Sequence, residues 1–364
     1  MTAAPPLQSR SALDTIPPAV PPSSNGFRSF GDYLQAVRLA AVTQRDVPGL
    51  VERAAPLGAG EQVPSDGGFL VPPKFVQDLI ERVYLNEVIK RCFSIPLATN
   101  ELSFPTFLET SRVNGSRMGG VEAYWENEAD TTTATKPKFG RGTLEMKKLI
   151  GLVYLTGELF QNSNALTIFG TQGFVKELEF RLTDAIVNGD GSGKPMGVMS
   201  SQAMIQVPKQ TGQAAGSVVS QNIVDVWSRC WAASRPNAIW LVHPDAEKAI
   251  ITESVAVGTA GSALPLYQFT DADKPNTLMG RPCIAIEQCQ VPGTPGDIIL
   301  CDLGRYILAT REYRQDVSIH VKFLTDEVAF RFVLRVDGQP IDQVPITPFT
   351  GTNTVSPFVS IAQR

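Results

Sequence analysis

The sequence is poor in the side chains that most often carry out catalysis. Its 364 residues include only two histidines, His243 and His320, although histidine is the side chain whose ordinary pKa best suits proton transfer near neutral pH. We interpret His243, which precedes Pro244 after an apolar run, as a turn residue, and His320 as a residue on a strand surface. The Gly-x-Ser-x-Gly motif of a nucleophile turn is also absent. These absences argue against acid–base and nucleophilic enzymes.

Cysteine is scarce as well, and its spacing does not indicate a metal site. The five cysteines are odd in number, and most of them have apolar neighbours, as free buried thiols usually have. No Cys-x-x-Cys pair occurs, so a structural zinc site is not expected. We therefore predict no metal, no cofactor and no catalytic residue. The cysteines are Cys92, Cys230, Cys283, Cys289 and Cys301.

Charge is also low. Charged residues make up 19% of the chain, against about 25% in an average soluble domain. Two explanations fit this low charged fraction: partners bury a large part of the surface, or the protein is a monomer with an uncharged, Thr- and Gln-rich surface. Composition does not distinguish between them. The net charge of −4 provides no overall field for holding nucleic-acid phosphates. A tight DNA-binding protein is thus excluded, whereas a container for DNA, which needs no affinity for it, is not.

Long apolar segments are missing too. No apolar run approaches the roughly 20 residues of a membrane span. The first residues lack the basic-then-apolar layout of a signal peptide. We expect a protein that is made and kept in the cytosol and has no membrane partner.

Proline is abundant at the N-terminus, where residues 1–24 contain three Pro-Pro pairs. Such a segment is predicted to be extended, and we expect a neighbouring subunit to hold it, because isolated termini are seldom ordered. The Pro- and Thr-rich residues 341–364 are predicted to form a second extended tail.

Periodicity predicts helices and strands between these ends. An amphipathic helix follows Gly67-Gly68, and a second carries one apolar stripe over 174–186 and ends at Asn188-Gly189. A third helix is predicted to be capped by Asn222. Further predictions are strands at 93–97, 102–107, 143–155, 238–242, 298–301 and 306–309, a helix at 245–253, and a long antiparallel pair over 313–336 that turns near Thr325-Asp326.

The apolar pattern is interrupted over residues 108–142, which are rich in Gly, Thr, Asn and charge. Such a stretch is too long for an ordinary connection and suggests a projecting arm with its own partner. The alternative is a floppy surface loop. Tyr124-Trp125 lies within this stretch and favours the arm, because exposed aromatic pairs usually cover something.

The segment from Gly189 to Lys194 superficially resembles a phosphate-binding loop. A true one has glycine five positions before the Gly-Lys pair, a hydroxyl residue after the lysine, and a helix that begins at the loop. Here Asn188 and Pro195 occupy those two positions, and the loop follows a helix. We interpret the glycines as structural turns. The turn residues are Gly67, Gly68, Asn188, Gly189, Gly191, Gly193, Pro195 and Gly197.

Four features in a fixed order carry a family resemblance. They are Asp66-Gly-Gly-Phe-Leu-Val-Pro72 before a helix, the long polar arm, Asn188-Gly-Asp-Gly191 followed by Pro195-x-Gly197, and the strand end Trp240-Leu-Val-His-Pro244. In this order they resemble the major capsid protein of tailed phages with the Hong Kong 97-type shell fold, an α+β fold. The resemblance covers residues from about 65 to 340.

The resemblance implies a domain organisation and a set of contacts. The implied segments are an N-terminal arm (1–66), a peripheral domain (67–107, 144–199 with a spine helix, and 313–340 with long strands), an extended β-hairpin loop (108–143), an axial domain (200–312) and the C-terminal tail (341–364). In such shells the axial domains meet at the centres of hexamers and pentamers, and the extended loop lies over the adjacent subunit. The implied contacts between subunits are Arg112, Arg117, Tyr124, Trp125, Glu126 and Glu128.

The resemblance also implies partners and a location. The protein is expected to assemble with itself in the host cytoplasm into the virion shell, with a portal and a possible separate scaffold, protease or decoration protein, around double-stranded DNA held non-specifically. Some family members join neighbours covalently through a loop lysine and a strand asparagine. Loop lysines are present at 136 and 138, but residues 304–336 contain no asparagine, so cross-linking is not expected.

Two alternatives remain open at this point. One is an encapsulin-type cellular compartment, which would load an enzyme cargo instead of DNA, although its usual N-terminal helix is not seen. The other is a cytosolic enzyme with an unrecognised site, which the shortage of histidines and metal ligands disfavours.

Overall fold

The structure is a computed structural model of the chain. It describes residues 26–27, 33, 36, 39, 50, 69–70, 83, 86–107, 110–113, 117–125, 134–156, 173–257, 262–270, 275–322 and 327–364. The chain divides into two compact units, one of residues 1–90, 148–181 and 310–336, and one of 91–147, 182–309 and 337–364. The segment boundaries implied by the family resemblance divide the chain differently and stay a prediction.

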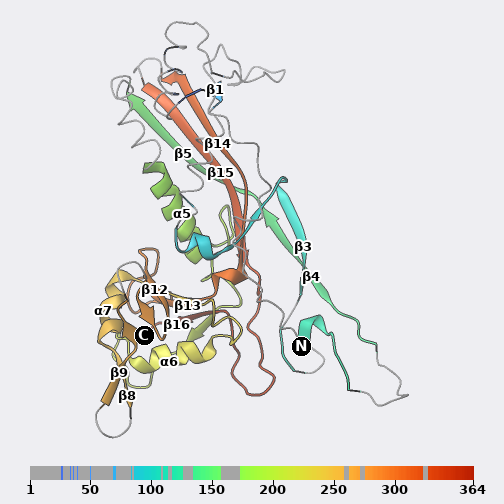
Figure 1. The fold of residues 1–364 in the computed structure, drawn as a ribbon, viewed down its shortest axis with the longest axis vertical. Helices are drawn as coiled ribbons and strands as arrows, with labels where there is room; N and C mark the ends of the chain where they lie inside the picture. The colour runs from blue at the N-terminus through green and yellow to red at the C-terminus, as the bar shows by residue number, and fades with distance from the viewer. Residues whose placement is uncertain are drawn as a thin grey trace, which may run out of the picture. The chain divides into compact units, whose positions relative to one another are not determined.

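The first unit is built on a sheet of long strands (Figure 1). Its main path runs β1 (Phe69–Leu70), β14 (Tyr306–Lys322), β15 (Glu327–Pro340) and β5 (Lys147–Thr156). Four residues, 323–326, connect β14 to β15, and so short a connection between paired strands requires antiparallel pairing. The predicted long pair is confirmed. Its turn lies outside the described residues.

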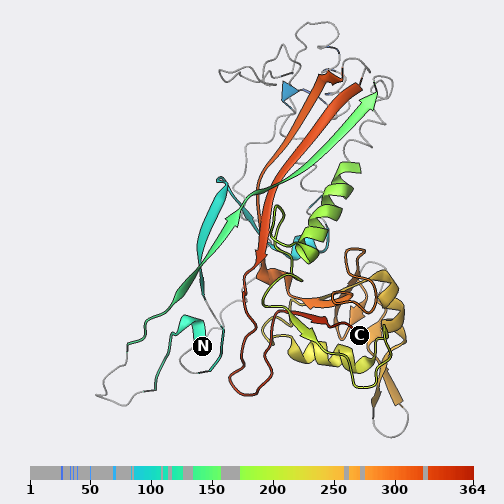
Figure 2. The same ribbon diagram turned by 180° about the vertical axis from the view of Figure 1, so that it is seen from behind.

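Helix α5 (Phe174–Asn188) begins against this sheet (Figures 1 and 2). The ring of Phe174 lies 3.8 Å, centroid to centroid, from the ring of Phe332 in β15. The same ring covers Gly151 of β5, where a Cβ atom would come within 2.6 Å of it. The predicted apolar stripe is buried at Leu178, Leu182 and Ile186, and the helix ends at Asn188 as predicted.

The second unit contains a seven-stranded sheet with the order β10-β11-β12-β7-β13-β16-β6. At its centre, β7 (Ile239–Val242) and β13 (Ile298–Cys301) are apolar runs buried on both faces, as their composition predicts. Helices α6 (Ser220–Arg229) and α7 (Pro244–Thr252) flank the sheet (Figure 2). The other strands are β6 (Ile205–Val207), β10 (Tyr267–Gln268), β11 (Thr277–Leu278) and β12 (Arg281–Ala285), and a separate hairpin pairs β8 (Ser254–Val257) with β9 (Ser262–Pro265).

The two helix starts of this unit differ in how well they were predicted. His243 is the N-cap of α7, and its Nδ1 accepts a hydrogen bond of 3.1 Å from the backbone N–H of Asp245, so it is the turn residue expected. The prediction that Asn222 caps α6 was wrong. The helix begins at Ser220 after Val219, and Asn222 lies in its first turn, where Oδ1 accepts from the backbone N–H of Val219. A polar side chain that folds back in this way marks the first turn as readily as the cap itself.

The prediction of an extended tail at 341–364 was also wrong. Residues Phe358–Ile361 form β16, which lies between β13 and β6 and is buried at all four positions. Val359 pairs with Leu300 on one side and Ile205 on the other. The preceding Pro- and Thr-rich residues obscured an apolar run that is too short to show a period.

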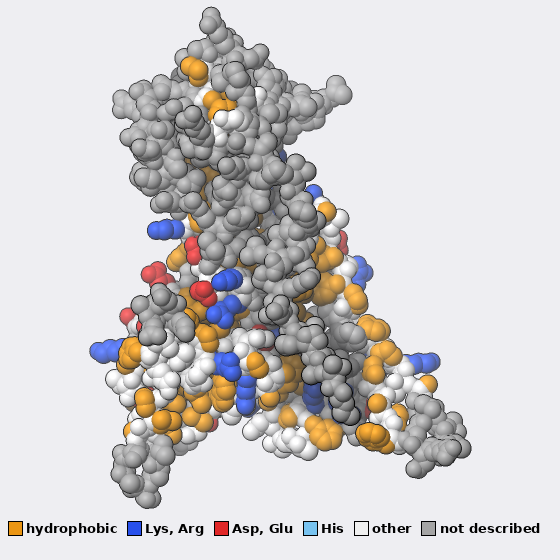
Figure 3. All heavy atoms as spheres, viewed as in Figure 1, with side chains coloured by type: hydrophobic (Ala, Val, Ile, Leu, Met, Phe, Trp, Pro, Cys, Tyr) orange, Lys and Arg blue, Asp and Glu red, His pale blue; other side chains and the backbone are white. Residues whose placement is uncertain are grey.

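The surface of the described residues is sparsely charged. In the view of Figure 3, hydrophobic side chains lie among uncharged ones, and charged side chains are scattered. Exposed large apolar residues occur in both units, for example Ile150 in the first and Phe269 in the second. No helix among the described residues combines the length and apolar character that crossing a membrane requires.

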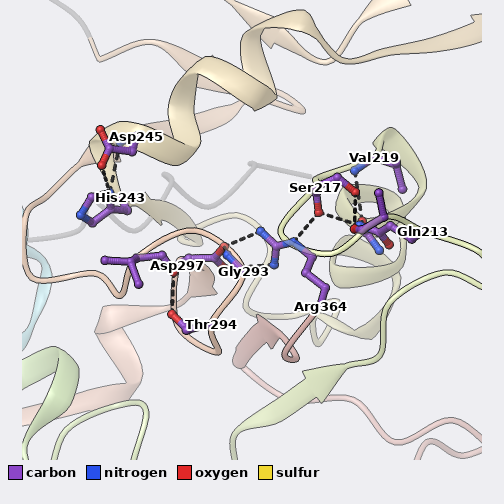
Figure 4. A network of polar contacts seen from close by, with 12 residues as sticks. Gln213, Ser217, Val219, His243, Asp245, Gly293, Thr294, Asp297 and Arg364 are labelled. Carbon is purple, nitrogen blue, oxygen red and sulfur yellow. Dashed lines mark hydrogen bonds and ion pairs between the residues drawn. The ribbon is translucent and has the colours of Figure 1, made fainter.

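A fully buried ion pair ties the end of the chain to the second unit (Figure 4). The guanidinium group of Arg364 binds both carboxylate oxygens of Asp297, with 3.1 Å between Nη1 and Oδ1, and neither side chain is exposed. Its Nε also donates to the carbonyl of Ser217 at 2.6 Å. Backbone hydrogen bonds join Arg364 to Gly216 and Gly293. Both charges are therefore paired and hydrogen-bonded, as burial requires.

We predict that Asp297→Ala lowers the free energy of unfolding of the unassembled subunit by about 3–5 kcal/mol, because it leaves the Arg364 guanidinium buried without its counter-charge. The double variant Asp297→Ala/Arg364→Met removes both charges, and its free energy of unfolding should fall by less. Urea unfolding of the two proteins measures the difference. Equal losses would contradict the prediction.

Candidate assembly surface

A two-stranded hairpin forms the base of the predicted extended loop. β3 (Glu101–Phe107) pairs antiparallel with β4 (Phe139–Glu145), from Glu101 opposite Glu145 to Phe107 opposite Phe139. One face packs into a core with Leu144 fully buried. The ring of Phe104 lies on Gly142, where an added Cβ would come within 2.7 Å of it. The hairpin that the family resemblance implied is therefore present, with its paired base starting before residue 108.

The aromatic pair on the loop lies in the open. Trp125 is fully exposed and Tyr124 is about half exposed, at 49%. The Tyr124 hydroxyl donates to the carboxylate of Glu122, and this hydrogen bond raises the pKa of the tyrosine. The predicted contact residues Glu126 and Glu128 lie outside the described residues. An indole this exposed in a single chain is a strong candidate for contact with a partner.

The two loop arginines, in contrast, have partners within the chain. The guanidinium carbon of Arg112 lies 5.2 Å from the ring centroid of Trp231, and that of Arg117, in the short 3₁₀-helix η4 (Arg117–Gly119), lies 5.8 Å from the ring of Phe349. Both distances suit cation–π attraction. Sequence reasoning missed both aromatic partners, because they lie far along the chain and no periodicity connects them to the loop.

The C-terminal segment also binds the loop through its backbone. Ser111 and Thr347 form an isolated parallel bridge. The Thr347 N–H donates to the carbonyl of Thr110 at 3.0 Å, and the Arg112 N–H donates to the carbonyl of Thr347 at 2.8 Å. This limb of the loop is thus fastened to residues of its own chain.

A second exposed surface lies on the sheet of the first unit. Ile150, Leu152 and Tyr154 alternate along β5 and are exposed. Side chains two residues apart share one face of a strand, and Gly151, between them, faces Phe174 of α5. The exposed stripe therefore lies on the face of the sheet opposite α5.

Charged side chains border this stripe. Lys148 is exposed at the same alternation as Ile150. On the neighbouring strands, Arg331 and Arg314 each lie 2.9 Å from the carboxylate of Asp316. Arg331 is adjacent to Phe332, which faces α5, so it belongs to the opposite face with the stripe. Two arginines share one carboxylate there.

Comparison with known proteins identifies the family. Residues 67–351, most of the chain, match the model of the phage capsid family. The chain belongs to this family. A search of curated proteins finds no match.

Solved structures agree with this assignment at the level of the fold. The capsid of a native GTA particle aligns with a TM-score of 0.54 at 16% identity, over 77% of this chain and 90% of that one. The capsid of an empty GTA particle aligns with a TM-score of 0.53 at 18% identity, over 75% and 88%. The predicted Hong Kong 97-type α+β fold is confirmed. The protein is a major capsid protein of a phage shell, a structural component located in the virion.

The predicted turn residues of this capsid protein form a closed reversal after α5. The Gly189 N–H donates to Ala185 and the Gly197 N–H donates to the carbonyl of Gly189, at 3.0 and 2.8 Å. A Cβ on Gly189 would lie 2.0 Å from the carbonyl oxygen of Pro195, which is buried, so no larger residue fits. Gly191 and Gly193 have positive φ angles of 80° and 71°.

Asn188 joins this turn to the rest of the second unit. Its Nδ2 donates to the carbonyl of Gln288 at 2.7 Å and to Asp184 Oδ1 at 3.0 Å. These contacts are compatible with the interpretation of the segment as a structural turn, which stays a prediction. Gly67 and Gly68, the other predicted turn, lie outside the described residues.

The cysteines of the capsid protein and the carboxyl group of Asp302 are buried. All five cysteines are buried and free. Burial raises the pKa of Cys230 to about 11 and that of Cys283 to about 12, so these thiols stay protonated at neutral pH. Burial also raises the pKa of Asp302, although the hydrogen bond that its Oδ1 accepts from the Gly304 N–H opposes this. Within the described ranges, no three His, Cys, Asp or Glu side chains lie close enough to hold a metal ion.

We predict that Gly189→Ala destabilises the capsid protein by at least about 3 kcal/mol, because backbone atoms occupy the position of the new methyl group. Gly193→Ala in the same turn is the matched control. It meets no atom within 4 Å, and its positive φ alone costs about 1–2 kcal/mol. Thermal unfolding of both variants should rank them in this order, and the reverse order would contradict the close packing described.

Proposed function

We propose that this capsid protein assembles as hexamers and pentamers into an icosahedral shell around packaged double-stranded DNA. The observation that carries the proposal is the fully exposed Trp125 on the hairpin loop, which needs a partner surface. In this proposal Tyr124, Glu126 and Glu128 accompany Trp125 in the contact with an adjacent subunit.

The contacts between subunits are proposed to be non-covalent. Residues 304–336 provide no asparagine for a link to the loop lysines. Each subunit of a closed shell touches several neighbours, so interfaces of standard size, roughly 1,600 Å², reinforce one another because no contact breaks alone. Moderate individual contacts are then sufficient.

The stripe on β5 is the proposed docking surface for the loop of another copy. Ile150, Leu152 and Tyr154 offer apolar area to the indole of Trp125. The loop carries Glu122, Glu126 and Glu128 around its aromatic pair, and the stripe is bordered by Lys148 and the arginines of β14 and β15. Opposite charges at the borders of an interface favour encounter and register.

Other partners follow from the role in a shell and remain proposals. A portal is required for DNA entry, and a separate scaffold, protease or decoration protein is compatible with this chain. DNA is proposed to be enclosed without specific binding, in keeping with the net charge of −4. We propose no enzymatic activity. An encapsulin-type compartment would enclose a protein cargo instead, and nuclease-protected DNA in purified particles distinguishes the two.

We predict that Trp125→Ala leaves a folded, soluble subunit that assembles poorly. Truncating a buried aromatic anchor typically costs 2 kcal/mol or more, so the subunit concentration at which particles appear should rise at least about tenfold. Electron microscopy and sedimentation velocity measure this. The control is Val291→Ala, which changes another exposed apolar residue, 58% exposed, elsewhere. Normal particles from Trp125→Ala would show that the loop assignment is wrong.

A disulfide tests the docking surface directly. Subunits carrying Glu122→Cys, mixed with subunits carrying Lys148→Cys, keep both Trp125 and the apolar stripe, and they should form a covalent dimer under mild oxidation during assembly, because the two sulfurs would meet across the interface. The five native thiols are buried and should contribute little background. Mixing Glu122→Cys with Val291→Cys is the control. If both mixtures cross-link equally on a non-reducing gel, or if neither does, the stripe is not the docking surface.

A further inference from the structure

Little of the extended loop is fastened by the hairpin itself. The β3–β4 ladder ends at the pair Phe107 and Phe139. Beyond it, among the described residues, the two limbs of the loop are joined where the Lys138 N–H donates to the carbonyl of Gly119 at 2.8 Å. Ordering a loop on assembly costs entropy to the extent that the loop is free to move in the single subunit.

The contact of Arg112 with Trp231 restricts that freedom. Trp231 follows α6 and is held next to the sheet of the second unit, since its backbone N–H donates to the carbonyl of Ser356 at 2.9 Å. Ser356 is fully buried just before β16, and its hydroxyl donates to the carbonyl of Ala203 at 2.5 Å. The backbone of Trp231 is therefore tied to the buried part of the second unit, and the guanidinium of Arg112 brings the loop to its indole.

A second arginine completes the arrangement. The guanidinium carbon of Arg305 lies 5.6 Å from the centroid of the same Trp231 ring. Two cations at one ring would repel each other, but Asp342 neutralises Arg305, with 2.7 Å between Nε and Oδ2. The indole can thus attract Arg112 without competition from an unpaired charge. Asp342 and Thr347, which binds the loop backbone, both belong to the segment that leads to β16.

We propose that Arg112 and Trp231 are positioning residues, which hold the loop in the orientation that docking requires before a neighbouring subunit is met. This inference rests on the proposed function, because it concerns how the loop becomes ready for assembly. It assigns Arg112 a role within its own subunit, in place of the contact between subunits that the family resemblance implied. Pre-organisation of this kind raises affinity by lowering the entropy lost on binding.

The test uses the variants Trp231→Leu and Arg112→Met in the full-length protein. Both remove the cation–π contact and leave an apolar side chain at the substituted position. In unassembled subunits, hydrogen–deuterium exchange of the peptide around Arg112 should become about threefold to tenfold faster, whereas the unfolding temperature should change little. The concentration needed for assembly should rise by a similar factor. Trp231→Phe keeps an aromatic ring and should restore most of both properties.

Controls separate positioning from general stability. Arg141→Met removes an arginine of the hairpin that binds the Ser103 hydroxyl but does not lie near Trp231, and it should leave exchange at Arg112 unchanged. If exchange near Arg112 stays slow in both test variants, or rises without any change in assembly, the inference is overturned. It is also overturned if exchange rises throughout the second unit together with a lower unfolding temperature.

Failure of this inference is distinguishable from failure of the proposed function. If Trp125→Ala assembles normally, the loop does not mediate assembly. The proposed function then fails, and the positioning role of Arg112 fails with it. If Trp125→Ala blocks assembly while Trp231→Leu and Arg112→Met assemble at the normal concentration, only the positioning role is refuted.

Discussion

The burial of β16 is the constraint on which the second unit depends. Because Phe358–Ile361 fills the position between β13 and β6, neither strand is left with an unpaired edge there. The residues before β16 must then cross the unit, where Asp342 pairs with Arg305 and Thr347 binds the backbone of the loop. The residue after it, Arg364, forms the buried pair with Asp297. One short strand therefore connects core, loop and chain end.

The same constraint gives the loop a defined base. A long polar insertion would otherwise be anchored by the hairpin alone, and a two-stranded hairpin is marginally stable in water. Here a strand bridge and two cation–π contacts tie it to other residues of the second unit. Those ties involve Arg112 and Arg117 and leave Trp125 exposed. The base of the loop is fixed and its aromatic residue is exposed. Such a loop can bind a partner and lose little conformational entropy on binding.

The low content of charged residues and the exposed apolar side chains have the same explanation. A monomer avoids large apolar patches, whereas a protein that covers its surface with copies of itself tolerates them. The stripe on β5 follows this pattern, since α5 covers one face of the strand and the other face stays apolar and open. Composition alone could not distinguish a surface that partners bury from the uncharged surface of a monomer. The match to the phage capsid family favours the first alternative.

The sequence by itself determined the elements that show a long period or a marked stop. The apolar stripe of α5, its end at Asn188, the buried runs of β7 and β13 and the alternation of β14 and β15 are local signals, because each repeats or terminates within a few residues. Only the tertiary structure decided that β16 is a central strand and that Trp231 is the partner of Arg112. Both depend on segments that are distant along the chain, and the free energy of such contacts comes from burial and ring–cation geometry that exist only after the chain has folded.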